Sequence, residues 1–586
     1  MASLDAFLFT PVAKTSRWRR LFWLSICLTY TLIWGIVAAQ EAFSFPYTVQ
    51  DDARQHVFWM QRFLDPNLFP NDLIADYFQS VAPWGYTQFY RLFAGLGVNP
   101  LLLSKLLPLP LTLAATAYGF GVAVQLLPIP LTGCLAGMLV SQTIWAHEDV
   151  ISASPRAFMP LIFLAFLYYL LRRRLLPCLV TIGLEGLFYP QYVFVFAGLL
   201  LCLPLRWRRG LRLSRERQDY WFSAAGLVVA FLVLLPFGLS ASVFGPTITA
   251  AEARELPEFY LGNRSSFFRD NALIFWLTGF RSGIFPSFAP PIIALGILLP
   301  WLLRRSQKFP LATQVHRKVM ILPQIAVVGL VLFGLAHAVL FKLHLPSRYT
   351  TYTLRYALIF ATAITLTLLL EAGLRRWTRS SSLLPRLGIA ALTVALTGHL
   401  LLLPTYTTEF PDHNYRTGEN PSLYNFFAQQ PKDIRIASLL READNLPTFS
   451  QRSVVVGREF AIPYHVGYAN EFRQRAMDLI QAQYTRDPAE LQRVIDTYQI
   501  TFWLIEPEVF KPRFLRQEWV RQYPTATKPA IRNLNRGVPV LQQRAEGCTV
   551  FRAKNLSVVD ATCLVADVVG AEPSASGGTL RLRIVK

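Results

Sequence analysis

Apolar segments about as long as a bilayer is thick recur along this chain and stop near residue 404. A transmembrane helix needs about 20 mostly apolar residues, because the hydrocarbon core of a bilayer is about 30 Å thick. With 53% hydrophobic and only 16% charged residues, the composition indicates a polytopic α-helical membrane protein. Eleven spans are predicted, at 21–40, 101–127, 129–146, 157–171, 175–189, 191–205, 220–240, 287–303, 319–342, 353–374 and 384–404.

Basic residues mark every second loop between these segments, and this pattern sets membrane orientation. They gather before the first span and after the fourth, sixth, eighth and tenth, as in RWRRGLRLSRER. We therefore expect a cytoplasmic N-terminus, with the first outer loop 41–99 and the chain after 404 in the periplasm or a lumen. Because these clusters account for the net charge of +21, no nucleic-acid partner is expected.

Composition divides the chain into a transmembrane domain, residues 1–404, and an extracytoplasmic α/β domain, residues 405–586. In the second domain, IRIASLL, SVVVG and TFWLIE are typical of strands, and DPAELQRVIDTY predicts a helix. Only Cys548 and Cys563 lie outside the predicted spans. In an oxidising compartment these two cysteines are expected to form a disulfide.

The first outer loop begins with two adjacent carboxylates, Asp51 and Asp52, in DDARQHVFWMQRFL. Apolar residues at Ala53, Val57, Met60 and Leu64 predict an amphipathic helix that lies on the bilayer surface. Two explanations for the carboxylates remain open. In the first, Asp51 or Asp52 caps this helix. In the second, a carboxylate at the height of the lipid headgroups takes part in chemistry.

A second outer loop, WAHEDVISASPRAFMP, contains Glu148, Asp149 and Arg156 close to the end of a span. These residues suit a polar site at the membrane surface. They also suit a solvated turn with helix caps, since Asp and Ser are favoured there.

A third outer cluster, KLHLPSRYTTYTLRY, contains Arg348, Tyr349 and Arg355. Its basic residues are predicted to lie outside the cytoplasm, whereas basic residues in membrane proteins normally gather in the cytoplasmic loops. A phosphate-bearing lipid explains them, because arginine binds phosphate with two parallel hydrogen bonds. The alternative is an arginine that reaches an ordinary phospholipid headgroup.

A long first span, an outer loop that begins with an acidic pair, many further spans and a terminal extracytoplasmic domain together resemble the GT-C glycosyltransferases. DDAR followed by FPNDL is similar to the Asp-acidic-x-Arg loop of aminoarabinose and related lipid-linked sugar transferases. The resemblance implies an enzyme of the bacterial inner membrane. Such an enzyme moves a sugar from a polyprenyl-phosphate donor to a glycan, lipid or protein acceptor outside the cytoplasm.

The same resemblance implies roles for single residues. Asp51 corresponds to the catalytic carboxylate, and Asp52 occupies the second acidic position. Glu148 or Asp149 would hold the acceptor or a metal. The donor phosphate would meet Arg348, with Arg156, Tyr349 and Arg355 nearby.

Two other functions remain open on the sequence alone: a transporter or flippase of lipid-linked glycans, and a non-catalytic membrane assembly protein. A transporter is typically built from internal repeats with interrupted helices, and no clear repeat is present in the sequence. The need for a divalent metal is also open, because aspartates alone do not decide it.

Overall fold

The computed structural model describes residues 2–207, 211–239, 242–285, 289–380, 382–406 and 410–566. The end of the predicted span 220–240, the beginning of 287–303 and the last twenty residues of the predicted domain 405–586 lie outside these ranges. The chain divides into two compact units. The first consists of residues 1–433, 444–453 and 457–473, and the second of 434–443, 454–456 and 474–586.

Helices occupy all eleven predicted positions in the first unit. They are α2 (Arg17–Ala42), α6 and α7 (Pro100–Leu106, Pro108–Leu126), α8 (Pro130–Trp145), α10 (Met159–Leu171), α11 (Leu175–Phe188), α12 (Val193–Cys202), α13 (Arg217–Leu239), the 3-10 helix Pro291–Leu298 with α15 (Leu299–Arg304), α16 (Ile321–Ala338), α17 (Ser347–Arg379) and α18 (Leu383–Tyr406). Shorter helices of this unit are α1 (Ala2–Phe9), α3 (Ala53–His56), α4 (Leu73–Val81), α5 (Trp84–Gly95), α9 (Glu148–Ile151), α14 (Ala250–Glu255), α19 (Pro421–Ala428) and α20 (Leu446–Phe449).

Six helical segments among the described residues are long and apolar enough to cross a membrane: Arg17–Ala42, Pro100–Leu126, Arg217–Leu239, Arg317–Ala338, Ser347–Arg379 and Leu383–Leu402. Four more apolar segments are shorter, at Pro155–Leu171, Leu175–Phe188, Pro190–Cys202 and Pro291–Arg304. The protein is therefore a helical polytopic membrane protein, as predicted.

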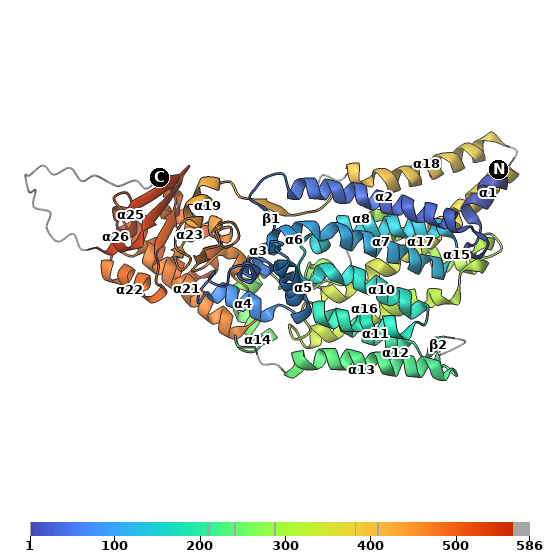
Figure 1. Ribbon diagram of the computed structural model, residues 1–586, viewed down its shortest axis with the longest axis horizontal. Coiled ribbons are helices and arrows are strands. Elements are labelled where there is room, and N and C mark those ends of the chain that lie inside the picture. Colours follow the sequence, from blue (N-terminus) through green and yellow to red (C-terminus); the bar gives the residue numbers. More distant parts are fainter. Residues whose placement is uncertain are drawn as a thin grey trace, which may run out of the picture. The chain divides into compact units, whose positions relative to one another are not determined.

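The helices of the bundle pack both against their neighbours in the chain and against helices that are distant in the sequence. Helix α2 lies against α7 and α8, α10 lies between α7 and α11, and α17 packs against both α8 and α16 (Figure 1). Small residues allow close approach at these contacts. A Cβ atom on Gly137 of α8 would lie 2.8 Å from the Cys27 Sγ of α2. The bundle therefore holds the loops at its ends in fixed positions.

The single amphipathic helix predicted after Asp52 is wrong. Only α3 is α-helical, and residues Phe58–Phe63 form a 3-10 helix. Phe58, Trp59 and Met60 are all buried within the protein, whereas Leu64, at the end of the predicted stripe, is 43% exposed. Consecutive residues of an α-helix point about 100° apart, so three in a row cannot all face one flat surface. Burial of all three favours the tighter, irregular turn.

The second unit contains most of a five-stranded sheet with the order β6-β5-β7-β9-β8. The strands are β5 (Arg435–Ala437), β6 (Ser453–Val454), β7 (Phe502–Ile505), β8 (Thr549–Ala553) and β9 (Leu556–Asp560), and the helices are α22 (Pro488–Tyr498), α23 (Pro512–Gln517), α24 (Pro524–Arg536), α25 (Val540–Arg544) and α26 (Ala561–Val565), while α21 (Val466–Tyr484) begins in the first unit. Strands β5 and β7 are parallel, and β7, β9 and β8 are antiparallel. The three predicted strands and the predicted helix are therefore confirmed.

Cys548 and Cys563 form a disulfide with a Cα–Cα distance of 5.5 Å. It joins the residue just before β8 to the first turn of α26 and therefore closes the β8–β9 hairpin at its open end.

Candidate active site

Five segments of the first unit converge at one end of the helical bundle. Strand β1 (Thr48–Gln50) pairs antiparallel with β4 (Tyr415–Thr417), and the backbone N–H of Asp51 donates to the Asn414 carbonyl at 3.2 Å. These contacts fix the acidic pair where the first outer loop begins. The loop between α8 and α10, the first turns of α17 and the loop 242–285 supply the other charged groups.

Asp51 is held between two arginines. Its carboxylate contacts the guanidinium of Arg54 and lies 2.9 Å from Nε of Arg416. Burial raises the pKa of Asp51, but the charges of Arg54 and Arg416 outweigh burial and hold that pKa below its usual value. Asp51 is therefore a carboxylate at neutral pH.

Asp52 faces a different pair of arginines. It contacts Arg156 and lies 3.9 Å from Arg264, and its own backbone N–H donates to Gln50 Oε1 at 2.7 Å. Burial raises the pKa of Asp52, and the charge of Arg156 reverses this and lowers the pKa below its usual value. Asp52 also occupies the N-cap position of α3, but its side chain accepts no capping hydrogen bond there. The capping explanation therefore fails for Asp52.

Glu148 and Asp149 join the same network through Arg156. The Arg156 guanidinium lies 3.1 Å from Glu148 and 3.4 Å from Asp149, so one arginine links the first and second outer loops. Asn414 donates to the other Glu148 oxygen at 2.8 Å. The side chain of His147, the N-cap residue of α9, makes no capping hydrogen bond.

The first turns of α17 meet Asp149. Tyr352 donates to Asp149 at 3.0 Å, and the guanidinium groups of Arg348 and Arg355 lie 3.5 and 3.9 Å from the carboxylate. Residues four and three positions apart share a helix face, so all three side chains point the same way. Tyr349 is on another face, where its hydroxyl donates to the backbone carbonyl of Leu343 at 3.0 Å. The structure therefore brings Arg348 and Arg355 into the network but not Tyr349.

The sequence did not single out Arg54, Arg264 or Glu459, which also belong to this network. Arg264 and Gln55 contact the Glu459 carboxylate, and Arg54 lies 3.5 Å from it. Burial raises the pKa of Glu459. Arg54 is part of the DDAR motif and could have been identified from it. Glu459 is more than 400 positions after Arg54 in the chain, and no local sequence pattern identifies it.

The network does not suit a divalent cation in this arrangement. Among the described residues, no group of three or more His, Cys, Asp or Glu side chains has the geometry to hold a metal ion. The physical reason is visible at Asp52 and Asp149, whose oxygens already face guanidinium groups. A cation placed there would have to displace or repel these arginines.

The network carries a positive excess. Its arginines are Arg54, Arg156, Arg264, Arg348, Arg355 and Arg416, and its carboxylates are Asp51, Asp52, Glu148, Asp149 and Glu459. The nearby histidines do not add charge at neutral pH, because burial lowers the pKa of His56 and of His147 to about 4 and that of His344 to about 3. Partly buried, fixed guanidinium groups beside ionised carboxylates are suited to bind an anion next to a base.

No protein-family model and no curated protein sequence matches this chain. Its fold is similar to that of the Archaeoglobus fulgidus oligosaccharyltransferase tethered with an acceptor peptide containing the NVT sequon. That comparison has a TM-score of 0.53 at 9% identity and covers 89% of this chain and 72% of the other.

Two further solved structures show lower similarity. The arabinofuranosyltransferase AftD from Mycobacteria gives a TM-score of 0.47 at 14% identity, with 84% of this chain and 37% of that chain covered. ArnT from Cupriavidus metallidurans bound to undecaprenyl phosphate gives a TM-score of 0.41 at 14% identity, with 92% of this chain and 98% of that chain covered. The similarity to the oligosaccharyltransferase, with its TM-score of 0.53, confirms as a similarity of fold the resemblance to GT-C membrane glycosyltransferases that the sequence predicts.

Proposed function

We propose that this protein is a GT-C-type membrane glycosyltransferase that moves a sugar from a polyprenyl-phosphate donor to an acceptor outside the cytoplasm. The observation that carries the proposal is the cluster of Arg156, Arg348 and Arg355 around Asp149, next to the ionised pair Asp51 and Asp52. The fold, similar to that of an oligosaccharyltransferase, supports the same reaction class.

The proposed donor site consists of arginines from two loops. Arg348 and Arg156 bind the donor phosphate, and Arg355 adds charge from two turns further along α17. Asp149 holds Arg348 and Arg156 in place, at 3.5 and 3.4 Å. Bidentate contact with guanidinium groups fixes the phosphate and stabilises the charge that it gains as the leaving group.

The proposed base is Asp51. As the acceptor oxygen forms its bond to the anomeric carbon, the bond from that carbon to the phosphate oxygen breaks, and its electron pair leaves with the polyprenyl phosphate. The acceptor proton passes to Asp51. A carboxylate beside the anomeric carbon also stabilises the oxocarbenium-like transition state. Asp52 orients Arg156 and Arg264 beside this reaction centre.

A binding measurement tests the donor site. Purified protein in nanodiscs is titrated with a C55 polyprenyl phosphate and, in parallel, with the phosphate-free C55 polyprenol. Hydrogen bonds to charged groups contribute about 1.5–3 kcal/mol, so Arg348→Ala should weaken binding of the phosphate at least about tenfold. Arg348→Lys should recover only part of this loss, because an ammonium group cannot make two parallel hydrogen bonds.

The matched control is Arg254→Ala. Arg254 is an exposed arginine in the same outer loop as Arg264, and its guanidinium lies over the ring of Phe268 at 5.8 Å. The Arg254→Ala variant should bind the C55 polyprenyl phosphate with the same affinity as the unmodified protein. Equal affinity for polyprenol and polyprenyl phosphate, or unchanged binding by Arg348→Ala, would contradict the proposed donor site.

A further inference from the structure

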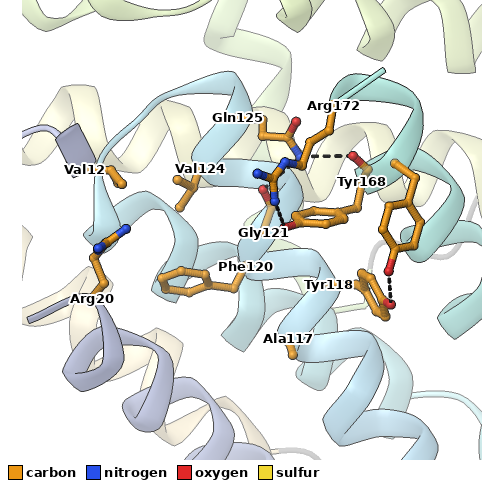
Figure 2. A pocket seen from close by; sticks show the side chains of 11 residues that line it. Val12, Arg20, Ala117, Tyr118, Phe120, Gly121, Val124, Gln125, Tyr168 and Arg172 are labelled. Carbon is orange, nitrogen blue, oxygen red and sulfur yellow. Dashed lines mark hydrogen bonds between the residues drawn. The ribbon is translucent and has the colours of Figure 1, made fainter. Parts of the chain in front are cut away.

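A cavity lies at the end of the helical bundle opposite the candidate active site. It has a volume of about 620 Å³ and is lined by side chains from α2, α7 and α10, including Arg20 and Gln125, and by Arg172 (Figure 2). Arg20 is in the first turn of α2, whose other end leads to β1 and Asp51. Arg172 follows α10, which begins just after Arg156. Both helices therefore separate this cavity from the candidate active site.

The charge of the cavity is positive and uncompensated. Within the described ranges, neither Arg20 nor Arg172 forms an ion pair with a carboxylate. Arg172 donates to the Tyr168 hydroxyl, and its guanidinium lies 5.3 Å from the centre of that ring. Figure 2 shows Arg20 on one side of the cavity and Arg172 on the other. An anionic ligand in the cavity would therefore lie between the guanidinium groups of Arg20 and Arg172.

The remaining lining combines apolar and adaptable polar groups. Val12, Ala117, Phe120 and Val124 form apolar wall, and the Tyr118 and Tyr169 hydroxyls hydrogen-bond to each other at 3.0 Å. The Gln125 amide donates two long hydrogen bonds, of 3.3 and 3.4 Å, to backbone carbonyls. Its Oε1 is buried and has no donor among the described residues.

We propose that this cavity is a specific binding site for the headgroup of an anionic glycerophospholipid. The phosphate binds to Arg172 and Arg20, the glycerol backbone and upper acyl chains lie on the apolar wall, and the weakly held Gln125 amide turns its free Oε1 toward a headgroup hydroxyl. A cavity between membrane helices with basic residues at its rim is the type of site that selects such lipids. Ordinary contact of arginines with any headgroup would show no such selectivity.

Native mass spectrometry of the purified full-length protein tests the site. Equimolar pairs of phosphatidylglycerol with phosphatidylcholine, and of cardiolipin with phosphatidylcholine, are offered in detergent. The anionic lipid of each pair should be retained about tenfold over phosphatidylcholine, since a charge-assisted contact contributes at least one factor of ten. Cardiolipin and phosphatidylglycerol should be retained equally, because a single phosphate binds to both arginines.

Variants locate the selectivity. Arg172→Gln and Arg20→Gln should each reduce it about tenfold, and Gln125→Glu, which places a negative charge in the cavity without changing its shape, should abolish it. The matched control is Arg305→Gln, because Arg305 lies 4.3 Å over the ring of Trp301 outside the cavity. No preference for anionic lipid in the unmodified protein would overturn the proposal. So would equal loss in Arg305→Gln and Arg172→Gln, or full selectivity in a folded Gln125→Glu protein.

Discussion

Arg156 contacts Asp52, Glu148 and Asp149, and its side chain is 11% exposed. Removal of one partner from a buried ion pair typically costs about 3–5 kcal/mol, because the remaining charge stays buried without compensation. We therefore expect Arg156→Met to lower the free energy of unfolding by roughly that amount, whereas Arg254→Met, at an exposed site, should change it by less than about 0.5 kcal/mol.

Thermal unfolding of the two variants in one detergent measures this difference. The triple change of Arg156→Met with Asp52→Asn and Asp149→Asn should recover part of the lost stability, since it removes two of the three carboxylates that lose Arg156 as a partner. Similar, small effects of Arg156→Met and Arg254→Met would show that the network does not depend on this guanidinium.

The carboxyl group of Asp444 should make the stability of the protein depend on pH. Burial raises its pKa to about 7, against the opposing charge of Arg54, and Oδ1 accepts a hydrogen bond from the Glu459 N–H at 2.9 Å. An unfolded Asp titrates near 3.9, so between about pH 4 and 7 the folded protein holds a proton that the unfolded chain has lost. The Asp444 contribution to stability therefore falls as pH rises through this window.

Asp444→Asn keeps the accepting oxygen and cannot ionise. The free energy of unfolding of Asp444→Asn, minus that of the unmodified protein, should be larger at pH 8 than at pH 5 by at least about 1 kcal/mol. Thermal unfolding of both proteins at the two pH values measures this difference. An equal difference at both pH values would mean that Asp444 does not titrate in this window.

At the scale of elements, the disulfide ties α26 to the β8–β9 hairpin across a sequence separation of 15 residues. A cross-link that closes a loop of this length stabilises a domain by about 3 kcal/mol through the entropy of the unfolded chain. We expect Cys548→Ser with Cys563→Ser to lower the unfolding free energy of the second unit by about 2–4 kcal/mol. Chemical denaturation followed by Trp fluorescence measures it, and a loss below about 0.5 kcal/mol would contradict this expectation.

The elements also show which parts of the fold and site could be predicted from sequence. Bilayer-length apolar segments specify helices almost by themselves, and the strand at Phe502–Ile505 and the helix after Asp487 have strong local patterns. The single helix predicted after Asp52 is wrong, because apolar residues at helical spacing also occur in a segment such as Phe58–Phe63, in which consecutive residues are buried. The sequence pointed to Asp52, Glu148, Asp149, Arg156 and Arg348, which the structure brings together. Partners such as Arg264 and Glu459 are brought in by distant loops, which local patterns cannot predict.

At the scale of the whole molecule, the arginine-rich loops predict the orientation in the membrane. Reporter fusions after about residue 212 and about residue 450 should give opposite signals, the first cytoplasmic and the second extracytoplasmic. The candidate active site would then face outward, and the Arg20–Arg172 cavity would face the cytoplasm. Signals from the same side would mean that the number of spans between the two positions is even.

Release of polyprenyl phosphate by the protein in proteoliposomes tests the proposed sugar transfer and the role of Asp51 as its base. The substrates are synthetic C55 polyprenyl-phosphate sugars carrying a pentose, a hexose or an amino sugar, and a membrane extract supplies the acceptor. The unmodified protein should release polyprenyl phosphate from at least one of them. Asp51→Asn should reduce the rate about 10²–10⁴-fold, since it removes the base with little change in volume.

Asp65→Asn is the matched control, because Asp65 is in the same outer loop, where its carboxylate pairs with Lys432 outside the network. It should release polyprenyl phosphate at the rate of the unmodified protein. A folded Asp51→Asn protein that still binds polyprenyl phosphate and releases it at the full rate would show that Asp51 is not the base.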